Sequence, residues 1–377
     1  MDWSLNPEEE RWQASARILA VRDFAPRAAE FDRHAAFPYS NFDALHEAGF
    51  LGLAVPETYG GSWCGYIPYA LAALEIAAGD ASTMCMLSMH FGCVFHVLTG
   101  ASPEQRERYL SQVVRDGRFF GVATADSSSD SPGTKGEVRA ERHGSRWRLR
   151  GRRHFVTGAG AADWLIVRAS EADGTSHTFV VAQKETPGVW ADRVGEGIGL
   201  RGSATHNVVF EDCMISDDDH IAGGMAFHEI GFYPVAGFSL GLSATVLGPA
   251  MAAYNFTRDL LKQTADAGSA SAVSQERRRL LAEMHVVLEG ARSLLLKAAW
   301  IADNQPSDLT VAVQGARFAC TQGAVYVTQK AMLACGGRAY LDRYPLERHL
   351  RDALAGPLQA GCHESCPERM AAELLEL

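Results

Sequence analysis

The sequence has little basic charge, no long apolar run and no closely spaced cysteine pair of the CxxC type. Its 377 residues include 35 lysines and arginines against 45 aspartates and glutamates, for a net charge of −10. Proteins that bind nucleic acid concentrate basic residues, so this balance argues against such a partner. No uninterrupted apolar run reaches the ~18 residues that suggest a membrane-spanning helix. We therefore expect neither nucleic acid nor a membrane as a partner.

Two further features concern location and redox state. The first ten residues are acidic and amphipathic, unlike a signal peptide, which predicts a cytoplasmic protein. The eight cysteines are scattered, and in a chain of this length that pattern indicates reduced, mostly buried thiols. Cys362, His363 and Cys366 are close in sequence. Without a second group of ligands at suitable spacing, they do not predict a metal site.

The hydrophobic pattern divides the chain into three regions, and its length is sufficient for two or three domains. Residues 1–118 show the three- and four-residue spacing of helices, and Ser102 before Pro103 is typical of a helix start. Residues 119–226 contain short β-branched and aromatic runs between Gly, Asp and Ser clusters, which predict a β-domain. Residues 227–377 return to helical spacing, with long helices expected over 275–302 and 309–335.

Five runs in the middle region are predicted strands. They share β-branched or aromatic residues and end at turn-forming residues. They are Trp147–Arg150, His154–Thr157, Trp164–Val167, Thr178–Val181 and Asn207–Phe210.

Several short motifs occur in one collinear order along the chain. They are Val55–Gly61 (VPETYGG), Gly151–Thr157 (GRRHFVT), Thr186–Val189 (TPGV), Phe210–Asp212 (FED), and the block from Gly336-Gly337 to Arg351-Asp352. Together they resemble the acyl-CoA dehydrogenase family over essentially the whole chain. The resemblance implies an α+β fold with an N-terminal helical domain, a middle β-domain and a C-terminal four-helix bundle.

The resemblance also implies an FAD site where the β-domain meets the second helical domain, usually in a homodimer or homotetramer. The cofactor-binding positions carried over to this chain are Thr124, Ser129, Phe155, Thr157, Gly336 and Gly337. Phe155 would pack on the isoalloxazine ring, and Thr157 would hydrogen-bond near flavin N5. The alternative for Phe155 and Thr157 is an ordinary strand with apolar side chains inward and polar ones outward.

One position departs from the family pattern. The family commonly has a glutamate nine residues after the arginine, which removes the α-proton of the acyl thioester. That position is Ala360 here, followed by Gly361. A methyl group cannot accept a proton, so another group must act as the base.

The candidate bases are His363 and Glu364, and Glu364 also has a structural alternative. An imidazole with a pKa near 6.5 is a competent base at neutral pH. His228 and Glu229, upstream of the next helix, are further candidates.

The sequence supports three functional hypotheses. The first is an FAD-dependent oxidoreductase that acts on an acyl-CoA or an acyl carrier protein thioester and passes electrons to an electron acceptor flavoprotein or to oxygen. The second is a flavin-dependent monooxygenase of the same fold, which uses reduced flavin and often places a histidine near it. His90 and His363 are the candidates for that histidine, and a structural role is the alternative for His90. The third is a non-catalytic family member.

Overall fold

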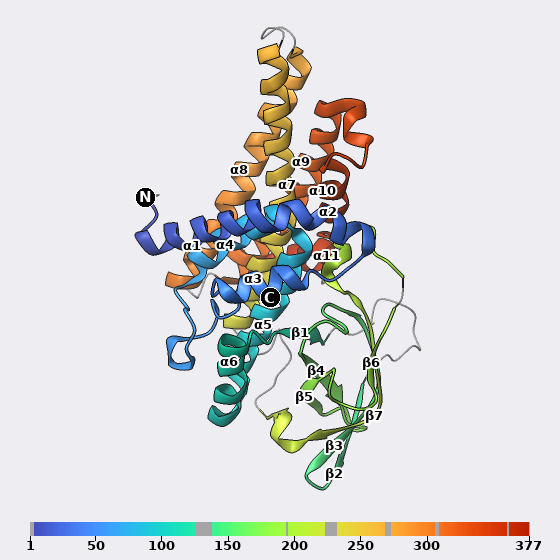
Figure 1. The fold of residues 1–377 in the computed structure, drawn as a ribbon. Helices are drawn as coiled ribbons and strands as arrows, with labels where there is room; N and C mark the ends of the chain where they lie inside the picture. Colours follow the sequence, from blue (N-terminus) through green and yellow to red (C-terminus); the bar gives the residue numbers. More distant parts are fainter. Residues whose placement is uncertain are drawn as a thin grey trace.

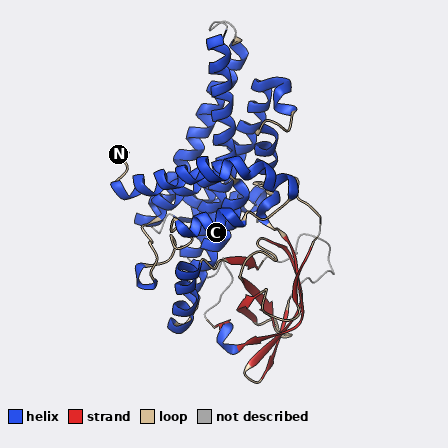
Figure 2. Cartoon of the chain, viewed as in Figure 1, coloured by secondary structure: helices blue, strands red, loops and turns tan. Residues whose placement is uncertain are grey.

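The computed structural model of the protein describes residues 4–124, 138–193, 195–222, 232–267, 273–305, 309–359 and 362–376. Helices at both ends of the chain pack into one body, and a β-domain lies beside it (Figures 1 and 2). The order of elements is helices, then strands, then helices, as predicted from the hydrophobic pattern. The predicted fold is confirmed.

The first helical region ends at Asp116, and two of its helices, the first and the last, begin with a capping box. Asn6 and Glu9 form a capping box at the first helix. Ser102 and Gln105 form another, with Pro103 in the first turn, so the predicted start is confirmed. The elements are α1 (Pro7–Leu19), a π-helical turn (Ala20–Phe24), α2 (Ala25–His34), α3 (Tyr39–Glu47), α4 (Tyr66–Gly79), α5 (Ala81–Gly100) and α6 (Pro103–Asp116).

The β-domain is built on one sheet with the order β6-β7-β3-β2-β4-β5-β8, and β1 pairs with β4. Most neighbours are antiparallel, whereas β4 runs parallel to both β1 and β2. The strands are β1 (Phe120–Ala123), β2 (Arg139–His143), β3 (Arg146–Val156), β4 (Trp164–Ser170), β5 (Ser176–Ala182), β6 (Val189–Asp192), β7 (His206–Ser216) and β8 (His220–Ile221).

Strand β3 corrects one expectation. The runs 147–150 and 154–157 were expected to be separate strands, but Arg146–Val156 is one continuous strand paired with β7. The pairing shifts register between Leu149 and Gly151 and again between Arg153 and Val156. At these two register shifts the alternation of the strand is interrupted, so the sequence pattern looks like two separate strands. The backbone nevertheless continues through both shifts as one strand.

In the second helical region, the longest helix is α7, and α8, α9 and α10 pack around it. Helix α9 has the predicted bounds, and α8 extends two residues beyond its predicted end. The elements are α7 (Phe232–Ala267), α8 (Gln275–Asn304), α9 (Leu309–Cys335), a 3₁₀ turn (Gly336–Tyr340), α10 (Leu346–Ala353) and α11 (Cys362–Leu374). Helix α7 contacts α4 and α5 of the first region as well as α8, α9 and α10, so it joins the two helical regions.

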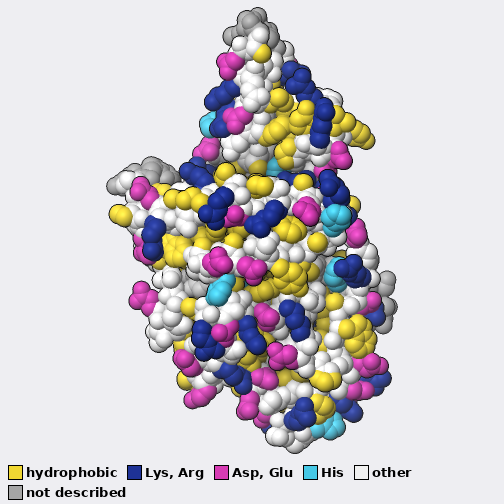
Figure 3. Space-filling view, in the orientation of Figure 1, with side chains coloured by type: hydrophobic (Ala, Val, Ile, Leu, Met, Phe, Trp, Pro, Cys, Tyr) yellow, Lys and Arg dark blue, Asp and Glu magenta, His cyan; other side chains and the backbone are white. Residues whose placement is uncertain are grey.

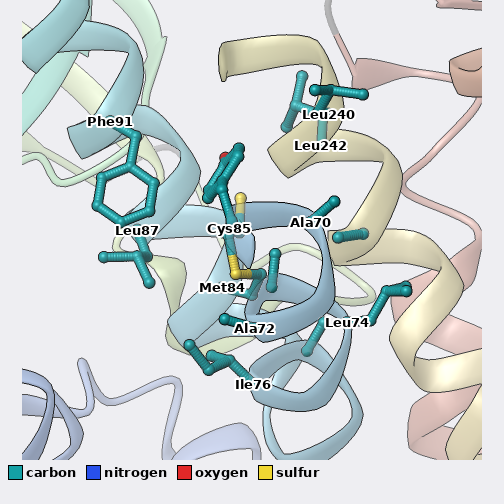
Figure 4. Close-up of a cluster of buried hydrophobic side chains, with 14 of the residues drawn as sticks. Ala70, Ala72, Leu74, Ile76, Met84, Cys85, Leu87, Phe91, Leu240 and Leu242 are labelled. Carbon is teal, nitrogen blue, oxygen red and sulfur yellow. The ribbon is translucent and has the colours of Figure 1, made fainter. Parts of the chain in front are cut away.

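Close packing at α7 depends on glycine. A Cβ at Gly241 would lie 2.1 Å from the Tyr69 hydroxyl, and one at Gly237 would lie 2.3 Å from Phe95. The Tyr69 hydroxyl also donates a hydrogen bond to the Gly237 carbonyl at 2.8 Å. Figure 4 shows side chains of α4, α5 and α7 meeting in this buried cluster. The two regions therefore share one hydrophobic core.

In the part of the chain that the structure describes, two helical segments are long and apolar enough to cross a membrane by length and composition. They are Ala81–Gly100 and the part of α7 from Ala236 to Ala267. In this structure 94% and 83% of their most apolar windows are buried inside the protein. Core helices of water-soluble domains commonly have this composition.

The cysteines are all free thiols. Cys64 is half-buried and the other seven are buried. Among the described residues, no three His, Cys, Asp or Glu side chains are grouped as metal ligands.

Candidate active site

The carboxyl end of β3 presents an aromatic side chain on an unusual backbone. Phe155 has φ +50°, in the left-handed region that costs free energy for a residue other than glycine. Its side chain is 69% exposed, whereas the neighbouring Val156 is buried. The register shift between Arg153 and Val156 reverses the expected alternation. The alternative of an ordinary strand with apolar side chains inward is therefore wrong at this position.

Thr157 follows this bulge, and its side chain is held inside the protein. It is only 8% exposed, and its Oγ1 lies 3.2 Å from Oγ1 of Thr205. An isolated bridge also pairs Thr157 with Val122 of β1. The bulge thus places an exposed aromatic ring two residues from a fixed, buried hydroxyl group. This arrangement suits a planar aromatic ligand with a polar atom at its edge.

The Gly336-Gly337 pair begins the 3₁₀ turn after α9. Gly336 has φ +64°, which favours glycine. At Gly337 an added Cβ would meet no atom within 4 Å. Packing within the chain therefore does not require glycine at 337, and the space beside it permits close approach by another group.

Of the two other predicted flavin contacts, one is the last residue before an undescribed segment and the other lies within that segment. Thr124 follows β1 and is half-buried. Ser129 lies outside the described residues.

The Arg351-Asp352 pair of the last motif holds the domains together. Arg351 forms a two-point ion pair with Asp32 of α2, at 2.9 and 2.6 Å. Asp352 accepts the backbone N–H of Leu200, in the segment before β7, at 2.7 Å. One end of α10 therefore fixes both the first helical region and the β-domain.

Comparison with known proteins agrees with this architecture. The N-terminal, middle and C-terminal domain models of acyl-CoA dehydrogenase match residues 6–116, 120–213 and 239–375, in that order. The chain belongs to the acyl-CoA dehydrogenase family.

Individual members of the acyl-CoA dehydrogenase family are similar over nearly the full chain. Human mitochondrial short-chain specific acyl-CoA dehydrogenase is 29% identical, over 93% of this chain and 86% of its own length. Butyryl-CoA dehydrogenase from Megasphaera elsdenii superposes with a TM-score of 0.91 at 26% identity, with full coverage of both chains. A Mycobacterium smegmatis glutaryl-CoA dehydrogenase in complex with FADH2 shares the fold, with a TM-score of 0.88, 20% identity, and 99% and 96% coverage.

The candidate bases of this acyl-CoA dehydrogenase family member are located at the start of α11. His363 and Glu364 are both exposed there. On the other side of the helix, Cys362 and Cys366 are buried, with their sulfur atoms 3.4 Å apart. The Cys366 thiol donates to Cys362 and lowers the pKa of that thiol. The described structure thus shows His363 and Glu364 facing solvent.

The other positions considered for the base are outside the described residues. These are His228 and Glu229, the two further candidates, and Ala360, the position where the family has its glutamate. Their assignment stays a prediction from the sequence.

Both ring nitrogens of His90 form hydrogen bonds with backbone groups. Its Nδ1 accepts the Phe120 N–H at 3.2 Å, so Nε2 carries the proton and donates to the Leu51 carbonyl at 3.0 Å. The side chain is fully buried, and burial lowers its pKa to about 4. His90 therefore links α5 to β1 and to the turn after α3 as a neutral structural group.

Sequence reasoning missed Thr205 and Ser203. The Ser203 hydroxyl lies 2.8 Å from that of Thr205, which in turn contacts Thr157. Ser203 and Thr205 are 46 and 48 residues from Thr157, and no local pattern indicates the contact. The signal available was that Leu200-Arg201-Gly202-Ser203 lies a few residues before the predicted strand Asn207–Phe210, which indicates a loop leading into a strand.

Proposed function

We propose that this protein is an FAD-dependent oxidoreductase that oxidises the acyl group of a thioester carried by CoA or by a carrier protein. One observation carries the assignment within the family: the bulge that exposes Phe155 beside the buried Thr157 hydroxyl. Phe155 and Thr157 would contact the flavin ring of FAD. The Gly336-Gly337 turn would contact the rest of the FAD molecule. Bound FAD supplies the hydride acceptor for a C–H bond adjacent to the activated position of the acyl group.

The substrate is expected to differ from a simple saturated acyl-CoA. Ala360 replaces the usual base, and general-base catalysis typically contributes about 10²–10⁴-fold. A substrate with a more acidic or heteroatom-bound proton reduces that requirement. His363 and Glu364 remain the proposed bases, and both are exposed at the start of α11.

We propose a cytoplasmic homodimer or homotetramer. In Figure 3 hydrophobic side chains gather on the projecting part of the molecule formed by the C-terminal helices. Tyr340 is 87% exposed, and Leu333 and Leu341 are exposed near it in sequence. Exposed apolar side chains that gather in one patch commonly mark protein interfaces. The electrons are proposed to pass to an electron acceptor flavoprotein or to oxygen.

A spectroscopic experiment tests the function. The purified protein should show an oxidised flavin spectrum, and the cofactor released by heat should be FAD. Anaerobic addition of CoA- and carrier-bound thioesters should bleach the flavin with the true substrate class. Simple butyryl-CoA should bleach it slowly.

Two outcomes would contradict the proposal. A protein that cannot bind FAD after reconstitution would favour a non-catalytic family member. Oxygen incorporation into a substrate with externally supplied reduced flavin, without any bleaching by thioesters, would favour the monooxygenase that the missing glutamate also permits.

A further inference from the structure

The bulge that exposes Phe155 lies opposite a single residue of β7. Between the last two register pairs of the two strands, β3 has His154 and Phe155 where β7 has only Asn207. Two residues opposite one define a β-bulge. The Asn207 side chain is 3% exposed, and its Oδ1 lies 3.1 Å from Nδ1 of His154. An amide oxygen only accepts, so Nδ1 of His154 carries the proton and donates it.

The bulge is also fixed from the core of the β-domain. Arg153 is 1% exposed, and its Nε and Nη2 both donate to the Arg168 carbonyl of β4. Val156, three residues after Arg153, is buried in the same domain. Because side chains alternate between the two faces of a strand, two inward residues three positions apart require one extra residue between them. Arg153 and Val156 therefore make the bulge necessary.

The conformation within the bulge needs a further constraint. Phe155 has φ +50°, which a residue other than glycine adopts only where surrounding contacts impose it. Arg153 and Val156 require an extra residue, but they do not fix the direction of its side chain. The hydrogen bond from His154 to Asn207 fixes the residue next to Phe155. It is the side-chain contact between the bulge and the strand opposite.

We propose that Asn207 is a positioning residue that acts through His154 to hold the Phe155 ring in the orientation that binds the flavin. The inference rests on the proposed function, since it takes Phe155 as the residue that packs on the flavin ring. Loss of the hydrogen bond allows the bulge to adopt other conformations, in which Phe155 is released from its unfavourable backbone angle. The affinity for a ligand falls in proportion to the fraction of protein in the binding conformation. FAD should then bind more weakly, although no contact to FAD itself is removed.

The test compares three substitutions with a control. Asn207→Ala removes the acceptor, and His154→Leu removes the donor. His154→Asn keeps a donor, because the amide nitrogen of asparagine and Nδ1 of histidine are both two bonds from Cβ. The control is Thr328→Val, since the Thr328 hydroxyl is also buried but donates to the Ala324 carbonyl within α9.

Fluorescence titration of each apoprotein with FAD gives the dissociation constant. Asn207→Ala and His154→Leu should each weaken FAD binding by about fivefold, which corresponds to one net hydrogen bond. His154→Asn should bind FAD about as tightly as the wild type. Thr328→Val should leave the dissociation constant unchanged.

A double-mutant cycle with Phe155→Ala separates positioning from a general structural role. In the Phe155→Ala protein there is no ring left to position, so Asn207→Ala should weaken FAD binding by less than about twofold. A general loss of folding would instead weaken it by the same factor in both backgrounds. Visible circular dichroism adds a second measurement, because it reports the surroundings of the bound flavin ring. The spectrum of Asn207→Ala should shift toward that of Phe155→Ala.

Unchanged FAD affinity in a folded Asn207→Ala protein would overturn the inference, as would an equal loss in the wild-type and Phe155→Ala backgrounds. A His154→Asn protein that binds FAD as weakly as His154→Leu would also overturn it. If Asn207→Ala does not fold, the two His154 variants, alone and combined with Phe155→Ala, provide the same cycle. A wild-type protein that binds no FAD, or a Phe155→Ala protein with unchanged affinity, would contradict the proposed function instead.

Discussion

The carboxylate of Asp352 accepts the backbone N–H of Leu200 at 2.7 Å and joins α10 to the β-domain across 152 residues of sequence. Both groups are buried. The contact fixes one end of the segment that reaches Thr205, so the last helical motif supports the proposed flavin site from behind.

Removal of this acceptor should destabilise the protein. Asp352→Ala leaves the Leu200 N–H buried without its partner, and such a loss typically costs about 1–3 kcal/mol. Urea denaturation of the apoprotein measures the change. Asp259→Ala is the control, because Asp259 forms an exposed ion pair with Arg258 on α7. Equal stabilities for the two variants would show that the Asp352 contact contributes nothing.

The same residue predicts a pH dependence. Burial raises the pKa of Asp352 to about 7, with further repulsion from Asp80 and opposition from the Leu200 N–H and Arg348. The folded protein therefore holds a proton that the unfolded chain releases between about pH 4 and 7. This group lowers the stability as the pH rises through that interval, and its effect is constant above it.

Asp352→Asn should remove that dependence. Its stability relative to wild type should improve as the pH rises from 4 to 7, by on the order of 1 kcal/mol per pH unit, and should level off above 7. Denaturation curves at matched pH values give the difference. A constant difference over this range would mean that the Asp352 pKa is not raised in the folded protein.

His90 should give a pH dependence of stability with the opposite sign to that of Asp352. Burial lowers its pKa to about 4, so between about pH 6.5 and 4 the unfolded chain binds a proton that the folded protein does not. Acidification should therefore destabilise the wild type through this group. His90→Gln should show a shallower loss of stability between pH 6.5 and 5, by up to ~1.4 kcal/mol per pH unit. Parallel pH profiles for the two proteins would exclude this role.

Two glycines form a matched pair for the packing of the segment before β7. A Cβ at Gly199 would lie 2.1 Å from the Arg351 carbonyl oxygen, whereas one at Gly290 of α8 would meet no atom within 4 Å. Gly199→Ala should move the segment, lower the melting temperature and weaken FAD retention. Gly290→Ala should stabilise α8 by about 0.5–1 kcal/mol, since alanine is the better helix former. Normal FAD affinity in Gly199→Ala would show that this approach of the segment to α10 is not needed for the site.

Ala360→Glu tests the missing base. A carboxylate at this position should increase oxidation of butyryl-CoA by on the order of 10²-fold, because general-base catalysis contributes about that much. The gain should be larger at pH 8 than at pH 6, since burial raises a carboxyl pKa and only the ionised form accepts a proton. Ala360→Gln is the control of equal size without a base. No gain in a folded, FAD-replete Ala360→Glu would favour the monooxygenase function.

The sequence by itself determined the order of elements and the family. Apolar spacing within α9 predicted its bounds at residues 309 and 335, and Ser102 with Pro103 predicted the start of α6. The collinear motifs identified Phe155 and Thr157 as candidate flavin contacts. The order and bounds of the elements depend on neighbouring residues, so local propensity, capping and periodicity are sufficient to reveal them. The family and the two flavin contacts, in contrast, were implied only by the resemblance of the collinear motifs.

The tertiary structure decided how those residues are presented. The bulge in β3 exposes Phe155 and buries Thr157, against the alternation expected of a strand. Thr205 meets Thr157 across 48 residues, and His90 bonds to Leu51 and Phe120 across 39 and 30. Such contacts arise only when separate elements pack together, because burial then requires each polar group to find a partner wherever the fold places one.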